Sequence, residues 1–497
     1  MKEIGKVFES TGSIIKVKLN SIDEFEQNKN FIKIGKYLTV QEGNLNYILV
    51  SILNIKTIEG TKDIEYHIET QPVGSYFQSD EIIDFKQGSI NIPSPTEPVF
   101  IPDNEIIDKI FAKSKDFTYK MGKLSNNDNI DYYINGNSFF SKHIGIVGST
   151  GSGKSCSVAK IIQQVAGINN ALNINKDNQK NSHIIIFDIH SEYKNAFSLA
   201  ESENFTLNNL DVEKINIPYW LMNSEELESL FIESNEMNSH NQISQFKRAV
   251  ILSKEKHNPG RKITYDMPVY FDIKEVYNFI YNLNSEVISK IDGEYGKPKL
   301  TNGHLVENIS EYLENTYEFI ASSQSKDNKA SNGPFNGEFE RFLTRIETKL
   351  NDKRLEFITN PKKEDESEFK TEDFSIILKQ FIGYIDKSNI SIIDLSGVPF
   401  EVLSITVSLV ARLIFDFAFH YSKNKHKNNE QNDIPFMIVC EEAHNYIPKD
   451  GGAEYNASRK SIERIAKEGR KYGLSLMVVG QRPSEVSETI FSQCNNF

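Results

Sequence analysis

The chain has 497 residues, of which 38% are hydrophobic and 25% charged, and its formal net charge is -13, from 56 basic and 69 acidic side chains. A single hydrophobic core stops growing near ~250 to 300 residues, so we expect two or three domains. The acidic balance excludes a protein that coats nucleic acid with its whole surface, but it leaves room for a local basic channel.

The compartment follows from the apolar runs and the cysteines. The longest apolar run, residues 402–411, is closed by Arg412 and Asp416 and reaches about half of the ~20 residues that a bilayer requires, so we expect no membrane contact. Charges at Glu3, Lys6 and Glu9 interrupt any secretory signal. Three cysteines without CxxC spacing support neither a disulfide framework nor a zinc site. We expect a cytoplasmic protein.

Residues 1–100 alternate short β-rich runs with Gly, Asn and charged turns, which predicts a small β-barrel or sandwich. The runs are residues 13–19, 37–41, 45–55, 64–70 and 88–92. This region has no Gly-rich loop and no cluster of nucleophiles or metal ligands, so its expected role is assembly or docking. The prolines of residues 93–102 predict a linker, and residues 101–135 a connecting segment with a short helix.

From residue 136 the pattern changes to apolar strands separated by helices, which is typical of an α/β protein. After the strand that opens at His143, further strands are predicted at 183–189, 391–395, 435–440 and 474–480. Short, continuously apolar strands indicate a mostly parallel sheet buried on both faces. Residues 136–199 and 386–497 are therefore the two parts of one core, and the polar, amphipathic residues 200–385 are a helical insertion between them.

The segment GSTGSGKS matches GxxxxGK[ST], with a strand before it and a helix after it, as a phosphate-binding P-loop requires. Glycines allow successive backbone N–H groups to turn toward phosphates at a helix N-terminus. Lys154 is expected to reach the β and γ phosphates, and the Ser155 hydroxyl to ligate Mg²⁺. The expected phosphate cradle consists of Gly148, Ser149, Thr150, Gly151, Ser152, Gly153, Lys154 and Ser155.

The strand at 435–440 ends in Glu441 and Glu442. Two glutamates after a strand more often begin a solvated helix, but a P-loop in the same chain favours a catalytic reading. In a nucleoside triphosphatase the first acid holds Mg²⁺ through water, and the second orients and deprotonates the attacking water. His444 either orients the neighbouring acid or completes a packing contact.

Two further strand ends carry polar side chains, at the edge where ligands bind to open α/β sheets. Gln481 is a candidate sensor of the γ-phosphate or the attacking water, and the alternative is a turn residue before Pro483. Asp188, with His190 and Glu192 close behind, is a candidate contact to phosphate or to water on Mg²⁺. No second cluster completes a dedicated metal site there.

Arginine is scarce, with ten residues against 46 lysines, yet four arginines fall within 24 residues: Arg459, Arg464, Arg470 and Arg482. This cluster indicates a site that needs a planar, permanently charged fork, and the alternative is a basic helix face. On a helix predicted at 456–471, Arg464 and Arg470 are separated by about 600° of rotation and point to different faces. One can serve its own subunit while the other faces a neighbour.

Together these blocks resemble the HerA family of hexameric DNA-pumping ATPases, within the HerA/FtsK group of P-loop proteins. The similarity rests on KHIGIVGSTGSGKS, FDIHSEY, IPYWLMNSEEL, ISIIDLSGVP, IVCEEAHNYIP, IAKEGRKYG and QRPSE, in the family's order. It implies a RecA-like core behind a HAS barrel, use of ATP and Mg²⁺, a homo-hexameric ring around double-stranded DNA, and a nuclease or sirtuin-like, NAD-consuming effector as partner. It also implies nucleotide roles for Lys154, Ser155, Glu441, Glu442 and Gln481, with Arg470 sensing the γ-phosphate.

The sequence departs from the family in two places. Many relatives carry Arg before the His that opens the P-loop strand, where this chain has Lys142, which lacks the bidentate fork. The chain also stops at Phe497, where relatives continue, so we expect either an unusually short protein or an incomplete C-terminus.

Two other readings compete with a DNA motor. The first is a signalling GTPase, because DLSG at Asp394–Gly397 fits the DxxG pattern, but no NKxD motif follows and the paired glutamates would be unexplained. The second is a ring that binds nucleotide only to assemble an anti-phage effector, without pumping DNA.

Overall fold

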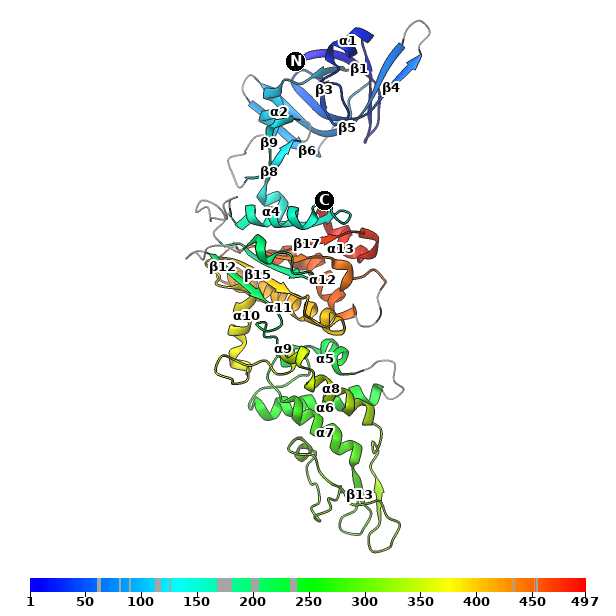
Figure 1. The fold of residues 1–497 in the computed structure, drawn as a ribbon, viewed down its shortest axis with the longest axis vertical. Helices are drawn as coiled ribbons and strands as arrows, with labels where there is room; N and C mark the ends of the chain where they lie inside the picture. Colours follow the sequence, from blue (N-terminus) through cyan, green and yellow to red (C-terminus); the bar gives the residue numbers. More distant parts are fainter. Residues whose placement is uncertain are drawn as a thin grey trace. The chain divides into compact units, whose positions relative to one another are not determined.

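The computed structural model describes the chain apart from residues 60–63, 80–81, 89–90, 112–117, 125–126, 167, 169–180, 198–204, 233–238, 431, 433, 451 and 453–454. The described residues form two compact units, Met1–Asn137 and Ser138–Phe497 (Figure 1). Each unit is described by itself.

The first unit contains a closed antiparallel barrel of six strands in the order β2-β1-β7-β3-β4-β5, with β5 pairing back to β2 and β6 continuing the sheet beyond β5. Alternate strand residues point inward, among them Ile4, Val17 and Leu38, and make a small aliphatic core. The strands are β1 (Lys2–Ser10), β2 (Ile15–Leu19), β3 (Tyr37–Glu42), β4 (Asn46–Glu59), β5 (Ile64–Ser79), β6 (Ile82–Gln87) and β7 (Pro98–Ile101). The predicted N-terminal barrel is confirmed.

Some details of this unit differ from the prediction. Strand β7 lies in the proline-rich stretch that we expected to be a linker, and it pairs with β1 and β3 in the barrel. A proline fits there because it stands at the first position of the strand. The expected connecting segment contains the helix α2 (Asn104–Phe111) and a hairpin of β8 (Thr118–Leu124) and β9 (Asn127–Asn135). Of the strand expected at 88–92, residues 89–90 lie outside the described residues, and the other three are not in a strand.

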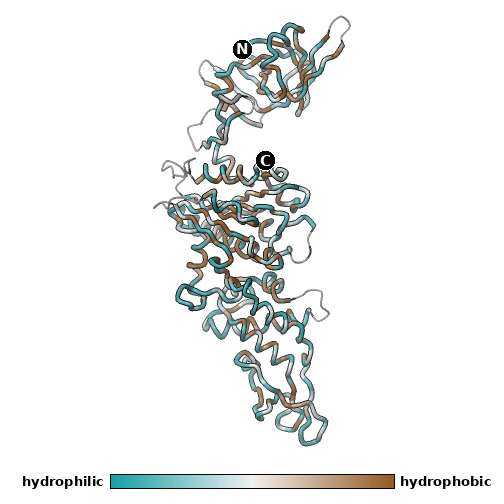
Figure 2. The backbone as a smooth tube through the Cα atoms, in the orientation of Figure 1, coloured by the Kyte–Doolittle hydropathy of each residue, from teal (hydrophilic) through white to brown (hydrophobic). Residues whose placement is uncertain are grey.

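The second unit is built on a seven-stranded sheet in the order β12-β15-β11-β16-β17-β10-β18, and every neighbouring pair is parallel. Its strands are β10 (His143–Val147), β11 (His183–Asp188), β12 (Phe205–Leu210), β15 (Ser388–Asp394), β16 (Phe436–Cys440), β17 (Leu474–Gly480) and β18 (Cys494–Asn496). The central strands β11, β16 and β17 are buried throughout, and hydrophobic segments run through the sheet (Figure 2). The predicted α/β core with a mostly parallel sheet is confirmed.

Helices cover both faces of this sheet. Helix α4 (Lys154–Ala166) lies on one face, and α11 (Phe400–Lys427) and α12 (Asn456–Glu468) lie on the other (Figure 1). Among the described residues, α11 is the one helix long and apolar enough to cross a bilayer, and 78% of its apolar window is buried inside the protein. The hydropathy of α11 is thus accounted for by its place in the core.

The regular elements between β12 and β15 are mainly helices, joined by long irregular segments. They include α5 (Ser224–Phe231), α6 (Ser239–His257), α7 (Ile273–Ser285), α8 (Glu340–Asn351), α9 (Glu356–Thr359), α10 (Phe374–Ile382) and a short hairpin of β13 (Val287–Ser289) and β14 (Ala330–Asn332). Strand β12 itself, at the start of the predicted insertion, belongs to the core sheet.

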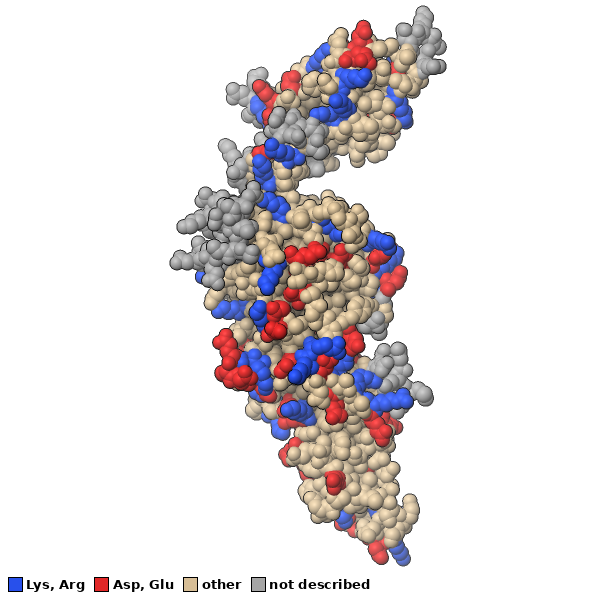
Figure 3. All heavy atoms as spheres, viewed as in Figure 1, with Lys and Arg blue, Asp and Glu red and all other residues tan. Residues whose placement is uncertain are grey.

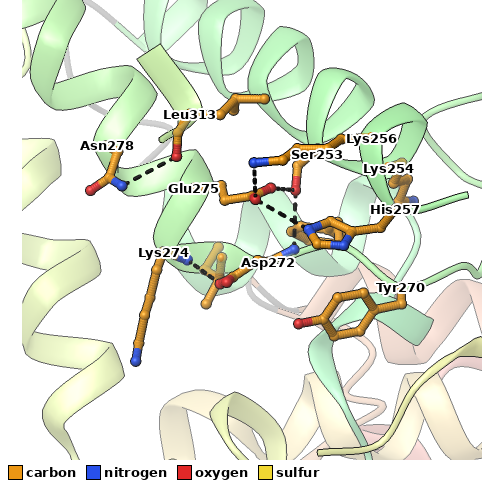
Figure 4. A network of polar contacts seen from close by, with 12 residues as sticks. Ser253, Lys254, Lys256, His257, Tyr270, Asp272, Lys274, Glu275, Asn278 and Leu313 are labelled. Atoms are coloured by element: carbon orange, nitrogen blue, oxygen red, sulfur yellow. Dashed lines mark hydrogen bonds and ion pairs between the residues drawn. The ribbon is translucent and has the colours of Figure 1, made fainter. Parts of the chain in front are cut away.

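A polar network joins the end of α6 to α7 (Figure 4). The Glu275 carboxylate accepts hydrogen bonds from the Ser253 hydroxyl and from Lys256 Nζ, which is 2.8 Å away, and His257 Nε2 lies 3.2 Å from the same carboxylate. Although partial burial raises the pKa of Glu275, these donors hold it below its usual value. These contacts join the C-terminal end of α6 to the N-terminal part of α7.

Candidate active site

The strand order brings the predicted chemical groups to one edge of the sheet. Strands β11, β16, β17 and β10 are consecutive neighbours, and all run in the same direction. Their carboxyl ends therefore lie side by side, and each leads into one of the predicted site segments. These segments are the loop after Asp188, the Glu441–Glu442 pair, Gln481 and the P-loop.

The P-loop joins β10 to α4, and its backbone explains its glycines. Gly151 and Gly153 have φ values of 77° and 85°, in the left-handed region that favours glycine. A Cβ atom on Gly148 would lie 2.5 Å from Ser152 Oγ. Because α4 begins at Lys154, the loop delivers its N–H groups to a helix N-terminus, which attracts anions.

Glu442 is the centre of the polar contacts at this edge. Its Oε1 lies 3.7 Å from Lys154 Nζ and accepts a hydrogen bond of 3.2 Å from Gln481 Nε2, while its Oε2 lies 3.4 Å from His444 Nδ1. Gln481 Oε1 in turn accepts a hydrogen bond of 2.9 Å from the Thr150 hydroxyl. Gln481 therefore links the P-loop to Glu442, as its position on the strand between β10 and β16 allows.

The backbone at Glu442 is strained. Its φ and ψ values are 43° and 50°, in the left-handed region that non-glycine residues seldom occupy, at a cost of about 1 to 3 kcal/mol. This conformation turns the chain sharply at the end of β16 into the short turn Ala443–Asn445. Glu442 lies against Lys154 and Glu441 against Ser155, the first two residues of α4.

Glu441 is 2% exposed, and its Oε1 lies 3.5 Å from the Ser155 hydroxyl. Its Oε2 accepts a hydrogen bond of 2.6 Å from the hydroxyl of Tyr193, which is buried. Burial raises the pKa of Glu441, the bond from Tyr193 offsets part of the rise, and the charge of Glu442 adds to it. Sequence reasoning missed Tyr193; the one available signal was an aromatic residue in an otherwise polar loop at a strand end.

The Asp188 carboxylate is fully buried, and its two oxygens accept hydrogen bonds of 3.1 and 3.0 Å from the backbone N–H groups of Glu192 and Tyr193. Burial raises the pKa of Asp188, and these two bonds lower it in part. Asp188 thus holds the loop that carries Tyr193. Both oxygens of Asp188 are thus engaged within the loop. The expected contact between Asp188 and the nucleotide stays a prediction.

Asp394, from the DLSG segment, lies at the end of β15 and is occupied locally. It accepts hydrogen bonds of 2.7 Å from the Ser191 hydroxyl and of 3.0 Å from the Ser396 N–H group. Strand β15 is separated from the P-loop strand β10 by β11, β16 and β17, or about 19 Å at the usual strand spacing. The GTPase reading required this aspartate at the γ-phosphate, and the sheet order places it elsewhere.

Of the clustered arginines, Arg482 follows Gln481 at this edge, whereas the two candidates Arg464 and Arg470 lie before β17, on α12 and in the turn after it. Arg470 lies in the turn Gly469–Tyr472 before β17, at the opposite edge of the sheet, where Gly473 O accepts a hydrogen bond from the N–H of Phe436, the first residue of β16. Seven residues of β17 separate that turn from Gln481, which corresponds to about 20 Å. Arg464 packs over the Phe415 ring and lies 3.9 Å from Asp416 on α11.

His143 opens β10 at the same edge as Arg470. One ring nitrogen, Nε2, donates to Ala466 O at 2.9 Å, and the other, Nδ1, accepts from the Leu476 N–H at 2.9 Å. Burial lowers the pKa of His143 to about 4, so the ring is neutral near pH 7. His143 therefore ties the P-loop strand to α12 and β17.

The site fits a magnesium ion of the kind that P-loop proteins use. Ser155 and Glu441 offer hydroxyl and carboxylate oxygens, the hard ligands that Mg²⁺ prefers, beside the place where the phosphates are expected. No cluster of three or more His, Cys, Asp or Glu side chains that could hold another metal occurs within the described part of the chain. An ion that shares its ligands with phosphate and water suits this arrangement better than an all-protein cage.

A parallel sheet with a P-loop on one strand, an acid pair on another and a polar side chain from the strand between them defines a P-loop ATPase. Comparison of the sequence with known protein families identifies a family within this class. The family "Helicase HerA, central domain" matches residues 119–414, more than half of the chain, and the protein belongs to this family.

Curated relatives and one solved structure are similar to much of this chain. A probable helicase of Methanocaldococcus jannaschii is 23% identical over 93% of this chain and 73% of its own length. The DNA double-strand break repair helicase HerA of Sulfurisphaera tokodaii is 27% identical over 81% of this chain, which spans 63% of that relative. The structure of VirB4 from Thermoanaerobacter pseudethanolicus superposes with a TM-score of 0.42 at 12% identity, covering 74% of this chain and 78% of that one.

Proposed function

We propose that this protein is an ATP-driven motor that acts on double-stranded DNA as a homo-hexameric ring in the cytoplasm. The observation that supports it best is the convergence of Lys154, Ser155, Glu441, Glu442 and Gln481 at one sheet edge, in a chain of the HerA family. The relatives named for DNA double-strand break repair suggest DNA as the substrate. By the family resemblance, a nuclease or a sirtuin-like effector is the expected protein partner.

The residues divide the chemistry among them. The P-loop N–H groups and Lys154 bind and orient the phosphates, and Ser155 with Glu441 would hold Mg²⁺, which neutralises charge on the phosphate oxygens when bound. Glu442 accepts the proton of the attacking water. Gln481 contacts both the P-loop and Glu442, so it can hold the base in line with the γ-phosphate.

Duplex-stimulated hydrolysis tests this function. The assembled protein should hydrolyse ATP with Mg²⁺, and duplex DNA should raise the rate of hydrolysis. The protein should also move along the duplex and displace a protein bound to it. Nucleotide binding with assembly but without DNA stimulation or translocation would favour the scaffold that only assembles an effector.

We expect DNA binding that depends on salt and hardly on sequence. On the face that Figure 3 shows, basic and acidic side chains are interspersed, so the described residues there offer no continuous basic surface to a duplex. Contacts confined to a ring channel go to phosphates, and each releases counterions. About six such contacts should lower the affinity by roughly 10³-fold between 50 and 200 mM salt, equally for unrelated duplexes. A strong preference for one sequence, at constant salt, would contradict this.

Mixed rings test whether active sites lie between subunits. Arg470 is about 20 Å from Gln481 of its own chain by the length of β17, so any contact with a γ-phosphate must be made in a neighbour. Lys154→Ala and Arg470→Ala protomers should each be inactive alone and regain ATPase activity when mixed. Arg354→Ala is the control for the loss of one arginine, because Arg354 is exposed and pairs with Asp352. Confirmed mixing without recovery would rule against Arg470 acting across the interface.

A further inference from the structure

We propose that Tyr193 is a positioning residue that fixes the Glu441 carboxylate for Mg²⁺, an inference that rests on the proposed function. The Tyr193 hydroxyl donates to Glu441 Oε2 at 2.6 Å, which leaves Oε1 turned toward the Ser155 hydroxyl at 3.5 Å. Tyr193 and Glu441 are 1% and 2% exposed. Because both side chains are buried, the phenol is the donor that keeps this carboxylate in one orientation.

The loop that carries Tyr193 is anchored at several points. The Tyr193 N–H group donates to Asp188, which is buried at the end of β11, and the Ser191 hydroxyl donates to Asp394 at the end of β15. Ser191 has a φ value of 56°, a strained conformation for a serine, and these anchors maintain it. The loop is thus built to deliver one aromatic side chain inward while its neighbours His190, Ser191 and Glu192 are exposed.

Two hydroxyl groups meet the Glu441 carboxylate, one at each oxygen. The Tyr193 hydroxyl lies 2.6 Å from Oε2, and the Ser155 hydroxyl lies 3.5 Å from Oε1. Phenol, carboxylate and serine hydroxyl therefore form one group at the metal position. Hydrogen bonds to ligands from such supporting residues commonly change metal affinity by about 10- to 100-fold.

The experiment compares the full-length protein with Tyr193→Phe and Tyr446→Phe. The control is matched because Tyr446 is equally buried and its hydroxyl donates to the Glu441 backbone oxygen at 3.1 Å, and not to the carboxylate. A fluorescent ATP analogue is titrated onto each protein in EDTA and then at increasing Mg²⁺. The electron paramagnetic resonance of Mn²⁺ reports metal bound with the nucleotide, independently of turnover.

Tyr193→Phe should bind the analogue in EDTA as the parent does. The metal raises the affinity for the analogue, and the variant should need about tenfold more Mg²⁺ or Mn²⁺ to reach half of that increase. Tyr446→Phe should match the parent. An unchanged metal requirement in Tyr193→Phe would overturn the proposal, and so would weaker binding in EDTA or loss of the cooperative thermal transition, since these assign the hydroxyl to the fold. If the parent itself binds no nucleotide, the proposed function fails instead.

Discussion

Glu442→Gln is expected to retain ATP and to lose turnover, with kcat lower by about 10² to 10⁴-fold, the usual contribution of a general base. The glutamine keeps an oxygen for the bond from Gln481 Nε2 but cannot take the proton of the attacking water. Lys154→Ala should instead weaken ATP binding by about 10- to 100-fold, because it removes a charged hydrogen-bond donor to phosphate.

These two variants separate chemistry from binding when binding is measured by equilibrium titration and chemistry by single-turnover hydrolysis. Glu430→Gln, at an exposed acid after α11, controls for loss of one negative charge. Hydrolysis by Glu442→Gln at the parent rate would remove Glu442 from the role of base.

Arg412→Met is expected to lower the free energy of unfolding by about 3 to 5 kcal/mol, because it leaves a buried carboxylate without its partner. Glu226 on α5 is fully buried, and it receives Arg412 Nε and Nη2 at 3.2 and 2.7 Å in a two-pronged contact. The same carboxylate accepts from Ser408 at 2.8 Å and from the Asn223 N–H at 3.0 Å. One acid thus joins α5 to α11 and caps its own helix.

The fluorescence of the only tryptophan can measure this loss of stability. Trp220 is 1% exposed and adjoins Leu221, whose carbonyl also accepts from Arg412, so its fluorescence follows unfolding of this region. The exposed pair Lys460–Glu225 joins α12 to α5, and Lys460→Met, the matched control, should cost less than about 1 kcal/mol. The double variant Glu226→Gln with Arg412→Met should cost less than the sum of the two single changes. Additive costs would show that the pair is not coupled.

The sequence was most informative where one backbone conformation or one charge pattern has few alternatives. The P-loop, the paired glutamates and the central strands were predicted, since glycines at positive φ and continuous apolar runs admit few other structures. Strand β12 was missed because its residues Thr206, Asn208 and Asn209 are polar, as suits the edge of a sheet. The β8–β9 hairpin was missed because its turn signal lay inside a segment that we read as a connection.

The partners of the site residues were harder to foresee. Tyr193 reaches Glu441 across 248 positions of sequence, and no local spacing encodes such a contact. The arginine cluster was predicted to mark a charged site, but the place of Arg464 and Arg470 depends on the direction of α12 relative to the sheet. Only the parallel strand order places Arg470 at the far edge.

Strand β17 has a mechanical consequence. It is buried along its whole length and is hydrogen-bonded to β10 on one side and β16 on the other, so it cannot slide or bend alone. Strand β17 therefore keeps a fixed distance between Gln481 at one end and the turn with Arg470 at the other. A change in contact at Gln481 can reach that turn through a tilt of the whole sheet, and in the proposed ring such a tilt would rotate the domain against a neighbouring subunit.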